Sequence, residues 1–188
     1  AIMPPKPYKF DVPVLYYGSS ITQGGCSSRP GNTYQQIISR RLNCDYVNLG
    51  FSGNARAEKP MAEYISKLKM SVFVYDYDHN APSAEYLRAT HKPMFDIIRK
   101  QNPELPIVMI SRPNVSNTAD ISERIEIIRN TYDTALREGD KNVYFINGQD
   151  IVNYSDPDII TVDGVHPNDF GFWCMAEVIG KTLEKILK

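Results

Sequence analysis

Side chains that together could carry out acyl transfer lie near the two ends of the sequence. Ser20 follows an apolar run at residues 14–17, and Asp163 and His166 lie three residues apart near the C-terminus. Acyl transfer requires a nucleophile, a base that takes its proton and a group that orients the base. We expect Ser20 to be the nucleophile, with Ser19 as the alternative. His166 is then the base, and Asp163 orients it.

The same reaction needs hydrogen-bond donors that stabilise the developing oxyanion. The backbone amides of Ser20 and Gly53 and the side-chain amide of Asn80 are the candidates for this role. Three polar residues are candidates for binding substrate: Ser19, His79 and Arg112. Structural alternatives stay open for these residues. A serine can cap a helix, a loop residue can hydrogen-bond its own loop, and an arginine can form a surface ion pair.

Short β-prone segments lead into the loops that carry these residues. The predicted strands are residues 12–17, 45–49, 71–77, 106–111 and 142–146. The first is a continuous apolar run that stops at a glycine, which is typical of a strand buried on both faces of a parallel sheet. Helical spacing predicts helices over residues 30–43, 56–70, 83–100, 118–137 and from 169 onward. Pro93 is expected to kink or restart the third helix.

This alternation of strands and helices predicts an α/β fold, a three-layer α/β/α sandwich with a five-stranded parallel sheet. By analogy with flavodoxin-like topology we expect the strand order 2-1-3-4-5, with right-handed crossovers. The loops after parallel strands meet at the carboxyl edge of a sheet. Ser20, Gly53, Asn80 and the loop containing Asp163 and His166 should therefore lie close together.

Length and composition indicate an ordinary globular domain. The chain has 188 residues and a formal net charge of −1, which gives no reason to expect a nucleic acid or an anionic membrane as partner. No apolar stretch approaches membrane-spanning length. The three cysteines, Cys26, Cys44 and Cys174, lack CxxC spacing, so neither a zinc site nor a disulfide framework is expected. We expect no metal and no cofactor.

The first ten residues are proline-rich and are predicted to be a linker-like segment, residues 1–10, ahead of the domain at residues 11–188. This start has no signal-peptide pattern. A periplasmic or secreted location would therefore require that such a peptide had been removed from a longer parent chain. The sequence leaves the oligomeric state open.

Four short blocks resemble the SGNH/GDSL hydrolase superfamily. Residues 18–21 (GSSI) resemble the GDSL block, and Gly53 lies in NLGFSGN, which is similar to the second block. Asn80 falls where the third block has an oxyanion-hole asparagine, and residues 163–166 (DGVH) match the final DxxH block. The blocks occur in family order over nearly the whole chain. The resemblance implies the α/β fold and the catalytic roles assigned above.

Two departures from the family pattern affect the assignments. Ser19 stands where the first block usually has aspartate, which creates the second candidate hydroxyl. The third block usually reads GxND, whereas this chain has Asp78, His79, Asn80 and Ala81. The run GSSITQGGCSSRPG resembles a bacterial GDSL-like subgroup whose members can carry a β-rich domain ahead of the hydrolase. That organisation would agree with a linker-like N-terminus.

The resemblance implies a serine esterase without cofactor that cleaves small acyl esters, with O-acetyl groups on carbohydrate as the leading substrate. A lipid or lysophospholipid acylhydrolase or a thioesterase of the same fold is the alternative. A flavodoxin-like FMN-binding module is a further alternative, because a Ser/Thr/Gly loop after the first strand could hold a phosphate. That interpretation leaves Asp163 and His166 without a role.

Overall fold

Five parallel strands form a single sheet in the order β2-β1-β3-β4-β5, the order expected by analogy with flavodoxin-like topology. The computed structural model describes residues 3–4, 6–113, 119–151 and 157–188. The strands are β1 (Phe10–Gly18), β2 (Cys44–Gly50), β3 (Val72–Asp76), β4 (Ile107–Ile110) and β5 (Val143–Ile146). The α-helices are α1 (Ser20–Gln23), α2 (Tyr34–Leu42), α3 (Lys59–Ile65), α4 (Ala84–Gln101), α5 (Ile121–Arg137) and α6 (Asp169–Ile186).

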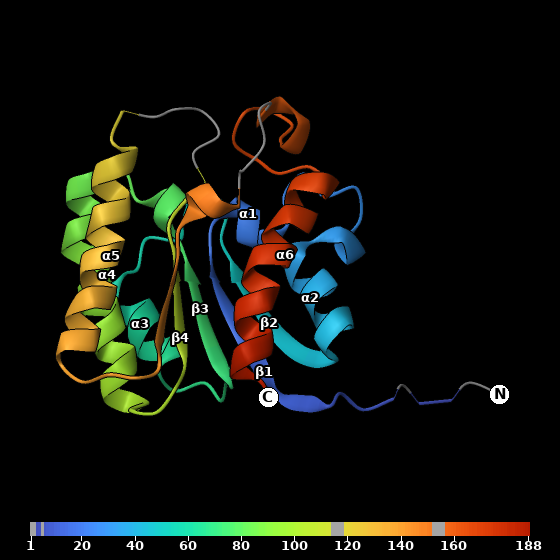
Figure 1. Cartoon of the computed structure of the whole chain (residues 1–188), viewed down its shortest axis with the longest axis horizontal. Coiled ribbons are helices and arrows are strands. Elements are labelled where there is room, and N and C mark those ends of the chain that lie inside the picture. The colour runs from blue at the N-terminus through green and yellow to red at the C-terminus, as the bar shows by residue number, and fades with distance from the viewer. Residues whose placement is uncertain (1–2, 5, 114–118, 152–156) are drawn as a thin grey trace.

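Helices cover both faces of the sheet, so the predicted three-layer α/β/α arrangement is confirmed (Figure 1). Helices α3, α4 and α5 lie on one face, and α2 and α6 lie on the other (Figure 1). Successive residues of β1 point to opposite faces. Leu15 and Tyr17 therefore join the core under α3–α5, while Val14 and Tyr16 join the core under α2 and α6. Burial on both faces explains why β1 is a continuous apolar run.

The predicted helix over residues 56–70 is wrong at both ends, because α3 covers only Lys59–Ile65. The backbone before α3 is held by tyrosines from other elements. The N–H of Ala57 donates to the Tyr17 hydroxyl at 2.8 Å, and the Tyr86 hydroxyl donates to the Arg56 carbonyl at 3.0 Å. Ala57 also has a φ of +54°, which a right-handed helix cannot contain. Tertiary hydrogen bonds thus override the local helical spacing.

The helix predicted over residues 30–43 begins four residues later than expected. Residues Pro30–Asn32 form a 3₁₀ turn, and α2 starts at Tyr34. The helix predicted from residue 118 is described as α5 from Ile121, and residues 114–118 lie outside the described part of the chain.

Helix α4 runs without interruption through Pro93, contrary to the expectation of a restart there. A proline cannot donate to the carbonyl four residues earlier, which here is that of Ala89. Ala89 and Pro93 are both exposed, so water can reach that carbonyl. A proline on the solvent side of a helix is therefore compatible with the buried face of α4, which includes Leu87, Met94 and Ile98.

Hydrogen bonds tie the loops at the carboxyl edge of the sheet to one another. The N–H of Ser52, after β2, donates to the Gln23 side chain at 3.1 Å, and the N–H of Ala55 donates to Asn80 Oδ1, after β3, at 3.1 Å. These bonds join the loops after β1, β2 and β3 into one surface. The predicted site residues of these loops therefore share one edge.

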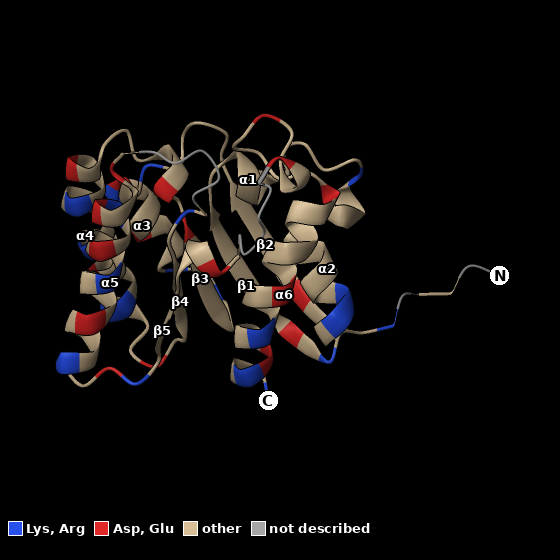
Figure 2. Cartoon of the chain, turned by 45° about the horizontal axis from the view of Figure 1, so that its top comes forward, with Lys and Arg blue, Asp and Glu red and all other residues tan. Residues whose placement is uncertain are grey.

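Charged residues of both signs alternate along the outer helices, as on α4 and α5 (Figure 2). Such mixing does not produce the one-sided field of a nucleic-acid-binding surface. Within the described segments, the search for helices long and apolar enough to cross a membrane found none.

Candidate active site

The short helix α1 places Ser20 directly after β1. The Ser19 hydroxyl accepts a hydrogen bond from the N–H of Ile21 at 3.1 Å and so caps α1. Ser20 is the first residue of the helix and is partly exposed. The turn needs glycine at position 18, because a Cβ there would lie 2.1 Å from the Asp76 carbonyl oxygen. Because Gly18 has no side chain, the end of β3 can approach it closely, and the candidate nucleophile Ser20 follows at the edge of the sheet.

A tight loop before α6 presents the imidazole of His166. The N–H of Val162 donates to the His166 carbonyl at 2.9 Å, and a β-bridge joins Thr161 to Pro167. Inside this loop, the Asp163 carboxylate accepts the backbone N–H groups of Val165 and His166 at 3.0 and 2.7 Å. The spacing of three residues between Asp163 and His166 thus forms a compact turn in which the carboxylate lies beside the ring.

A continuous hydrogen-bonded chain connects Ser20, His166 and Asp163. The Ser20 Oγ lies 2.9 Å from His166 Nε2, and His166 Nδ1 lies 2.7 Å from Asp163 Oδ2. A carboxylate only accepts hydrogen bonds, so the proton of the neutral ring belongs on Nδ1. Nε2 is then free to accept the Ser20 proton. The structure brings together the three residues that the sequence predicts for nucleophile, base and orienting group.

Local hydrogen bonds hold Asp163 in its charged form although it is exposed. The backbone N–H of His166, the His166 ring and the N–H of Val165 lower the pKa of Asp163 to about 2. A carboxylate that accepts several hydrogen bonds is favoured in its ionised state. Asp163 therefore carries a negative charge throughout the neutral pH range, as the partner of an imidazolium must.

The candidate oxyanion donors lie in the joined loops after β1, β2 and β3. The backbone N–H groups of Ser20 and Gly53 have no hydrogen-bond partner among the described residues. Gly53 has a φ of +69° within an exposed turn. Because Ala55 N–H is a donor, it must bond the oxygen of the Asn80 amide. This bond fixes the amide orientation and leaves its NH₂ group available.

His79, beside Asn80, carries a buried ring nitrogen with no partner. Its Nε2 is enclosed and accepts or donates no hydrogen bond among the described residues. Burial lowers the pKa of His79 to about 4, which outweighs the opposite effect of the nearby Asp78 carboxylate. The imidazole is therefore neutral at pH 7.

Ser19 and Arg112 both make hydrogen bonds within the protein. Ser19 is 1% exposed and its hydroxyl caps α1, so the expectation that it binds substrate is not supported. Arg112 pairs with the buried Asp78, to which both its backbone N–H and its Nε donate, at 3.0 and 3.4 Å. The ion-pair alternative for Arg112 thus agrees with the structure.

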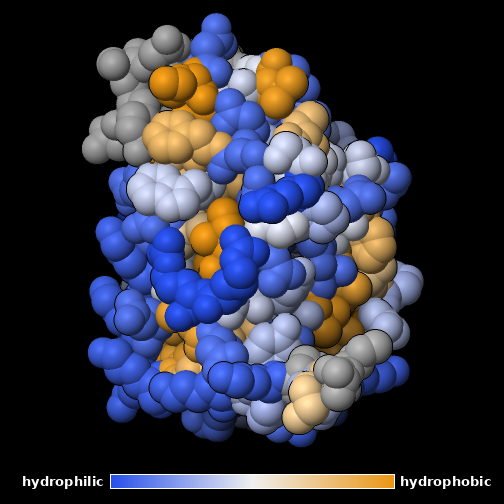
Figure 3. Space-filling model, turned by 90° about the vertical axis from the view of Figure 1, so that its right-hand side faces the viewer, coloured by the Kyte–Doolittle hydropathy of each residue, from blue (hydrophilic) through white to orange (hydrophobic). Residues whose placement is uncertain are grey.

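Two surfaces near the catalytic loops were not evident in the sequence. A polar hollow of about 340 Å³ adjoins the helix that carries Ser20; its lining includes Gln23, Gly24, Ser27, Ser28, Arg29, Tyr46 and Asn48. The other is apolar: Ile159, Val162, Val165, Phe170 and Trp173 are between 37% and 63% exposed. Figure 3 shows apolar surface near the upper end of the side that α2 and α6 cover. The spacing of residues 159–173 does not distinguish exposed from buried apolar positions.

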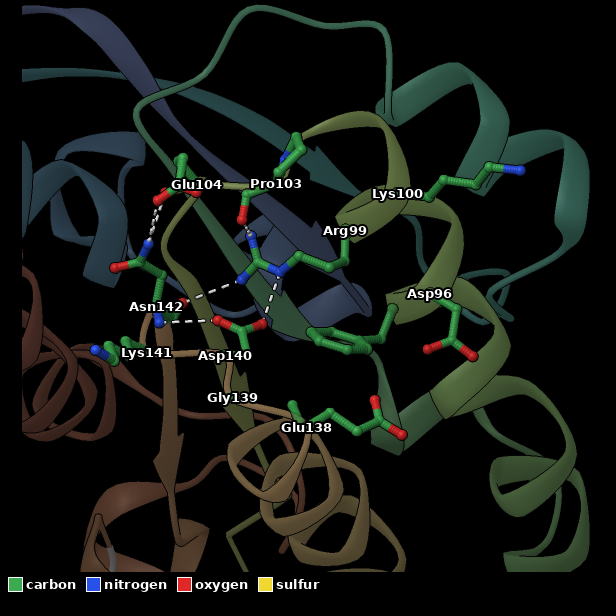
Figure 4. A pocket seen from close by; sticks show the side chains of 12 residues that line it. Asp96, Arg99, Lys100, Pro103, Glu104, Glu138, Gly139, Asp140, Lys141 and Asn142 are labelled. Carbon is green, nitrogen blue, oxygen red and sulfur yellow. Dashed lines mark hydrogen bonds and ion pairs between the residues drawn. The ribbon is translucent and has the colours of Figure 1, made fainter.

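A larger hollow of about 620 Å³ lies at the opposite edge of the sheet, between the ends of α4 and α5 (Figure 4). Its central side chain, Arg99, donates to Asp140 and to backbone carbonyls such as that of Leu105. Among the residues that the structure describes, no cluster of three or more His, Cys, Asp or Glu side chains could hold a metal ion.

Comparisons with known proteins agree with this geometry. The model of the GDSL-like Lipase/Acylhydrolase family matches residues 11–184. Among solved structures, a putative GDSL-like lipase from Bacteroides ovatus ATCC 8483 has 30% sequence identity and a TM-score of 0.85, covering 97% of this chain and 55% of that one. A search of curated proteins found no match.

More distant structures share the fold. A family two carbohydrate esterase from Clostridium thermocellum in complex with cellohexaose has 19% identity and a TM-score of 0.75, covering 99% of this chain and 67% of that one. A two-domain esterase active on acetylated mannans, co-crystallized with mannopentaose, has 20% identity and a TM-score of 0.70, covering 94% of this chain and 50% of that one. The chain thus spans about half the length of this esterase and of the Bacteroides lipase. Since the family model matches nearly its whole length, the chain belongs to the GDSL-like lipase/acylhydrolase family.

Proposed function

We propose that this protein is a serine esterase that cleaves small acyl esters, O-acetyl groups on carbohydrate first among them, through an acyl-enzyme on Ser20. The observation that carries the proposal is the hydrogen-bonded chain from Ser20 Oγ through His166 to Asp163, with distances of 2.9 and 2.7 Å. An unassisted serine hydroxyl is a weak nucleophile, so it needs an adjacent base of this kind.

In the proposed reaction, Ser20 Oγ attacks the ester carbonyl carbon while its proton passes to His166 Nε2. The imidazolium then gives that proton to the leaving alcohol oxygen, the carbon–oxygen bond to the alcohol breaks, and the acyl group remains on Ser20. In the second half, water attacks the acyl carbon and loses a proton to Nε2. The bond between this carbon and Ser20 Oγ then breaks, the carboxylic acid leaves, and Nε2 returns the proton to Oγ. Asp163 holds Nδ1–H in place and stabilises the imidazolium in both halves.

The tetrahedral oxyanion would be bound by the N–H groups of Ser20 and Gly53 and by the Asn80 amide. These three donors come from loops that hydrogen bonds join to each other, so their spacing is set before substrate binds. Donors that are already in place cost no reorganisation when the charge develops.

The carbohydrate part of the proposal rests on the surroundings of Ser20. The hollow next to α1 combines hydroxyl, amide and guanidinium side chains with the Tyr46 ring and Pro30, a mixture that suits a sugar better than a long acyl chain. Two distant structural relatives were solved with bound oligosaccharides. They share the fold with this chain and supply only a precedent for the substrate class.

A lipid acylhydrolase is the second candidate function. The exposed apolar residues that follow the catalytic loop favour this second function. Two of them, Phe170 and Trp173, lie shortly after His166 in the sequence, and their rings stack nearly parallel with centroids 5.9 Å apart. Exposed apolar surface of this kind is what an acyl chain or a membrane lipid would contact.

A fluorophosphonate probe tests the proposed nucleophile. We expect one covalent adduct, mapped by mass spectrometry to Ser20, and loss of both labelling and esterase activity in Ser20→Ala. Loss of the nucleophile of a triad typically lowers the rate by about 10⁴ to 10⁶. Ser19→Ala is the matched control and should keep most of the activity, although the helix cap is lost. An adduct on Ser19, or an inactive Ser19→Ala with an active Ser20→Ala, would refute the assignment.

A further inference from the structure

A buried charged cluster lies directly behind the turn that carries Asn80. The Asp78 carboxylate is 1% exposed and Arg124, from α5, is 3% exposed. Arg124 Nη1 donates to Asp78 Oδ1 at 3.0 Å, and the backbone N–H of Arg112 donates to Asp78 Oδ2 at 3.0 Å. Both carboxylate oxygens are therefore bonded, as a buried charge requires. Asp78 stands where the third family block usually has glycine.

Arg124 also bonds the backbone at both ends of the same turn. Its Nη1 donates to the Asp78 carbonyl at 3.3 Å, and its Nη2 donates to the Ala81 carbonyl at 3.2 Å. Asn80 lies between these two carbonyls, in the 3₁₀ turn Asp78–Asn80. Asp120 completes the cluster by accepting from Arg124 Nε at 2.5 Å. One guanidinium thus joins the turn to α5.

The anchoring of Asn80 follows from these contacts. Its side-chain oxygen is held by Ala55, and its backbone is held from behind by Arg124 through the carbonyls of Asp78 and Ala81. An oxyanion donor must lie within a few tenths of an ångström of its productive place, and a misplacement of about 1 Å can cost about a hundredfold in rate. A planar guanidinium can make all of these bonds at once, whereas an ammonium cannot.

We propose that Arg124 is a positioning residue for the oxyanion hole, which fixes the Asn80 amide by clamping the turn between Asp78 and Ala81. The inference rests on the proposed role of Asn80. Arg124 does not touch the reacting atoms, and its contribution to turnover passes through Asn80. Removing the clamp should therefore change turnover only while the Asn80 amide is present.

A double-mutant cycle on kcat and KM for 4-nitrophenyl acetate tests this dependence. Asn80→Ala should lower kcat by roughly 10² to 10³. Arg124→Lys should lower kcat by about 10- to 100-fold with KM nearly unchanged. In the Asn80→Ala background, Arg124→Lys should change kcat by no more than about twofold, because coupled residues are not additive. Equal losses in both backgrounds, or a change confined to KM, would overturn the proposal.

Arg99→Lys is the matched control for a general loss of stability. Arg99 is likewise a little-exposed arginine that binds a carboxylate and several carbonyls, but it lies at the opposite edge of the sheet (Figure 4). The Arg99→Lys substitution should lower the melting temperature while leaving kcat near the parent value. An equal loss of kcat in Arg99→Lys would show that weakening the contacts of any little-exposed arginine impairs turnover. That result would contradict a specific role for Arg124.

Nuclear magnetic resonance separates failure of the clamp from failure of the proposed reaction. The side-chain NH₂ signal of Asn80, identified by its absence in Asn80→Ala, should shift in Arg124→Lys and stay in place in Arg99→Lys. An unmoved signal in Arg124→Lys would overturn the inference whatever the activity. A shifted signal with normal kcat in Asn80→Ala would instead refute the oxyanion role of Asn80 and, with it, the effect on turnover.

If Arg124→Lys does not fold, Asp120→Asn replaces it in both experiments. The Asp120 side chain is 38% exposed, so its loss should be tolerated, while Arg124 loses the partner that fixes it on α5. The same changes in kcat and in the Asn80 signal are expected, with smaller size. Unchanged values for both in a folded Asp120→Asn would count against the clamp.

Discussion

Two aspartates near the catalytic edge have opposite electrostatic properties. Asp163 is exposed, and hydrogen bonds from His166 and Val165 lower its pKa to about 2. Asp76, at the end of β3, is 3% exposed, and burial together with the charge of Asp78 raises its pKa to about 8. The charged partner for the histidine is thus supplied by the exposed loop. The buried aspartate at the sheet edge is kept neutral at pH 7.

The charge on Asp163 leads to a prediction about the base and its partner. His166→Ala should lower kcat/KM by about 10⁴ to 10⁶, since the Ser20 hydroxyl then lacks a base. Asp163→Asn should cost less, because the imidazole remains while its tautomer and charge support are lost. Steady-state kinetics on 4-nitrophenyl acetate measure both. Asp96→Asn, which removes an exposed carboxylate on α4, is the control and should be neutral. Multiplying losses in a Ser20/His166 double variant would contradict one catalytic unit.

Asp76 leads to a prediction about stability and pH. Its folded pKa lies above the unfolded one, so between about pH 4 and pH 8 the unfolded chain releases a proton that the folded chain retains. This group therefore lowers the free energy of unfolding as pH rises through that window. The Asp76→Asn variant should not show this decrease in the free energy of unfolding, because asparagine does not titrate.

Melting temperatures of Asp76→Asn and the parent between pH 5 and pH 9 test this prediction. The variant should gain relative to the parent as pH rises to about 8 and then show a constant difference. The melting temperatures of the two proteins must be subtracted at each pH, because the buried His79 and His91 also titrate. Their lowered pKa values make the folded state more stable as pH rises through the acidic range, which is opposite to the effect of Asp76. A difference that does not vary with pH would mean that Asp76 titrates normally.

At the scale of elements, tertiary contacts make one helix shorter than the local sequence predicts and keep another continuous where the sequence predicts a break. Helix α4 continues through a proline because its buried face packs against the sheet, while the interrupted hydrogen bond faces solvent. Helix α3 is shorter than its spacing predicts because tyrosine hydroxyls hold residues 56 and 57 in a non-helical conformation. Packing and hydrogen bonding, rather than propensity, determine where these helices end.

The interior proline of α4 leads to a prediction about stability. Pro93→Ala restores the N–H that can bond the Ala89 carbonyl, and it should raise the free energy of unfolding by about 2 kcal/mol after the entropy gained by the unfolded chain is subtracted. Urea denaturation measures the change. Pro60→Ala is the matched control, since Pro60 lies in the first turn of α3, where proline is tolerated. A destabilised Pro93→Ala would mean that α4 requires the proline for its packing.

At the scale of the whole molecule, the surface around the site limits the substrate. The polar hollow beside α1 and the apolar residues that follow the catalytic loop favour different ester classes. Ile21, which follows Ser20, is 1% exposed and belongs to the core, so it offers almost no apolar surface to an acyl group. The choice between acetyl esters and lipids therefore depends on which surface the acyl chain meets.

A chain-length series of 4-nitrophenyl esters tests the proposed acetyl preference. We expect kcat/KM to be highest for acetate and to fall by octanoate, and acetylated oligosaccharides to release acetate. An acyl groove would instead add about 0.8 kcal/mol per buried methylene. A steady rise from acetate to decanoate would refute the acetyl-ester proposal and favour the lipid alternative. In that case Trp173→Ser should reduce the rise, because it removes exposed apolar surface beyond His166.

The sequence alone determined the fold class and the residues able to perform the chemistry. Continuous apolar strands such as residues 14–17 and the alternation with amphipathic helices predict a sheet with helices on both faces, because burial patterns are local. The family blocks around Ser20 and His166 are also local patterns. The predicted strand order came from fold analogy, since pairing between strands is not encoded in any one segment.

The tertiary structure decided what depends on contacts between distant segments. Ser20 and His166 are 146 residues apart in sequence and 2.9 Å apart in space, a contact that exists only when β1 and the loop before α6 meet at the same edge. Adjacent hydroxyls look equivalent in the sequence, yet one caps α1 and the other faces the imidazole. The clamp of Arg124 on the Asn80 turn likewise arises because α5 lies beside the turn that follows β3, and hydrogen bonds act over a few ångströms in space whatever the separation along the chain.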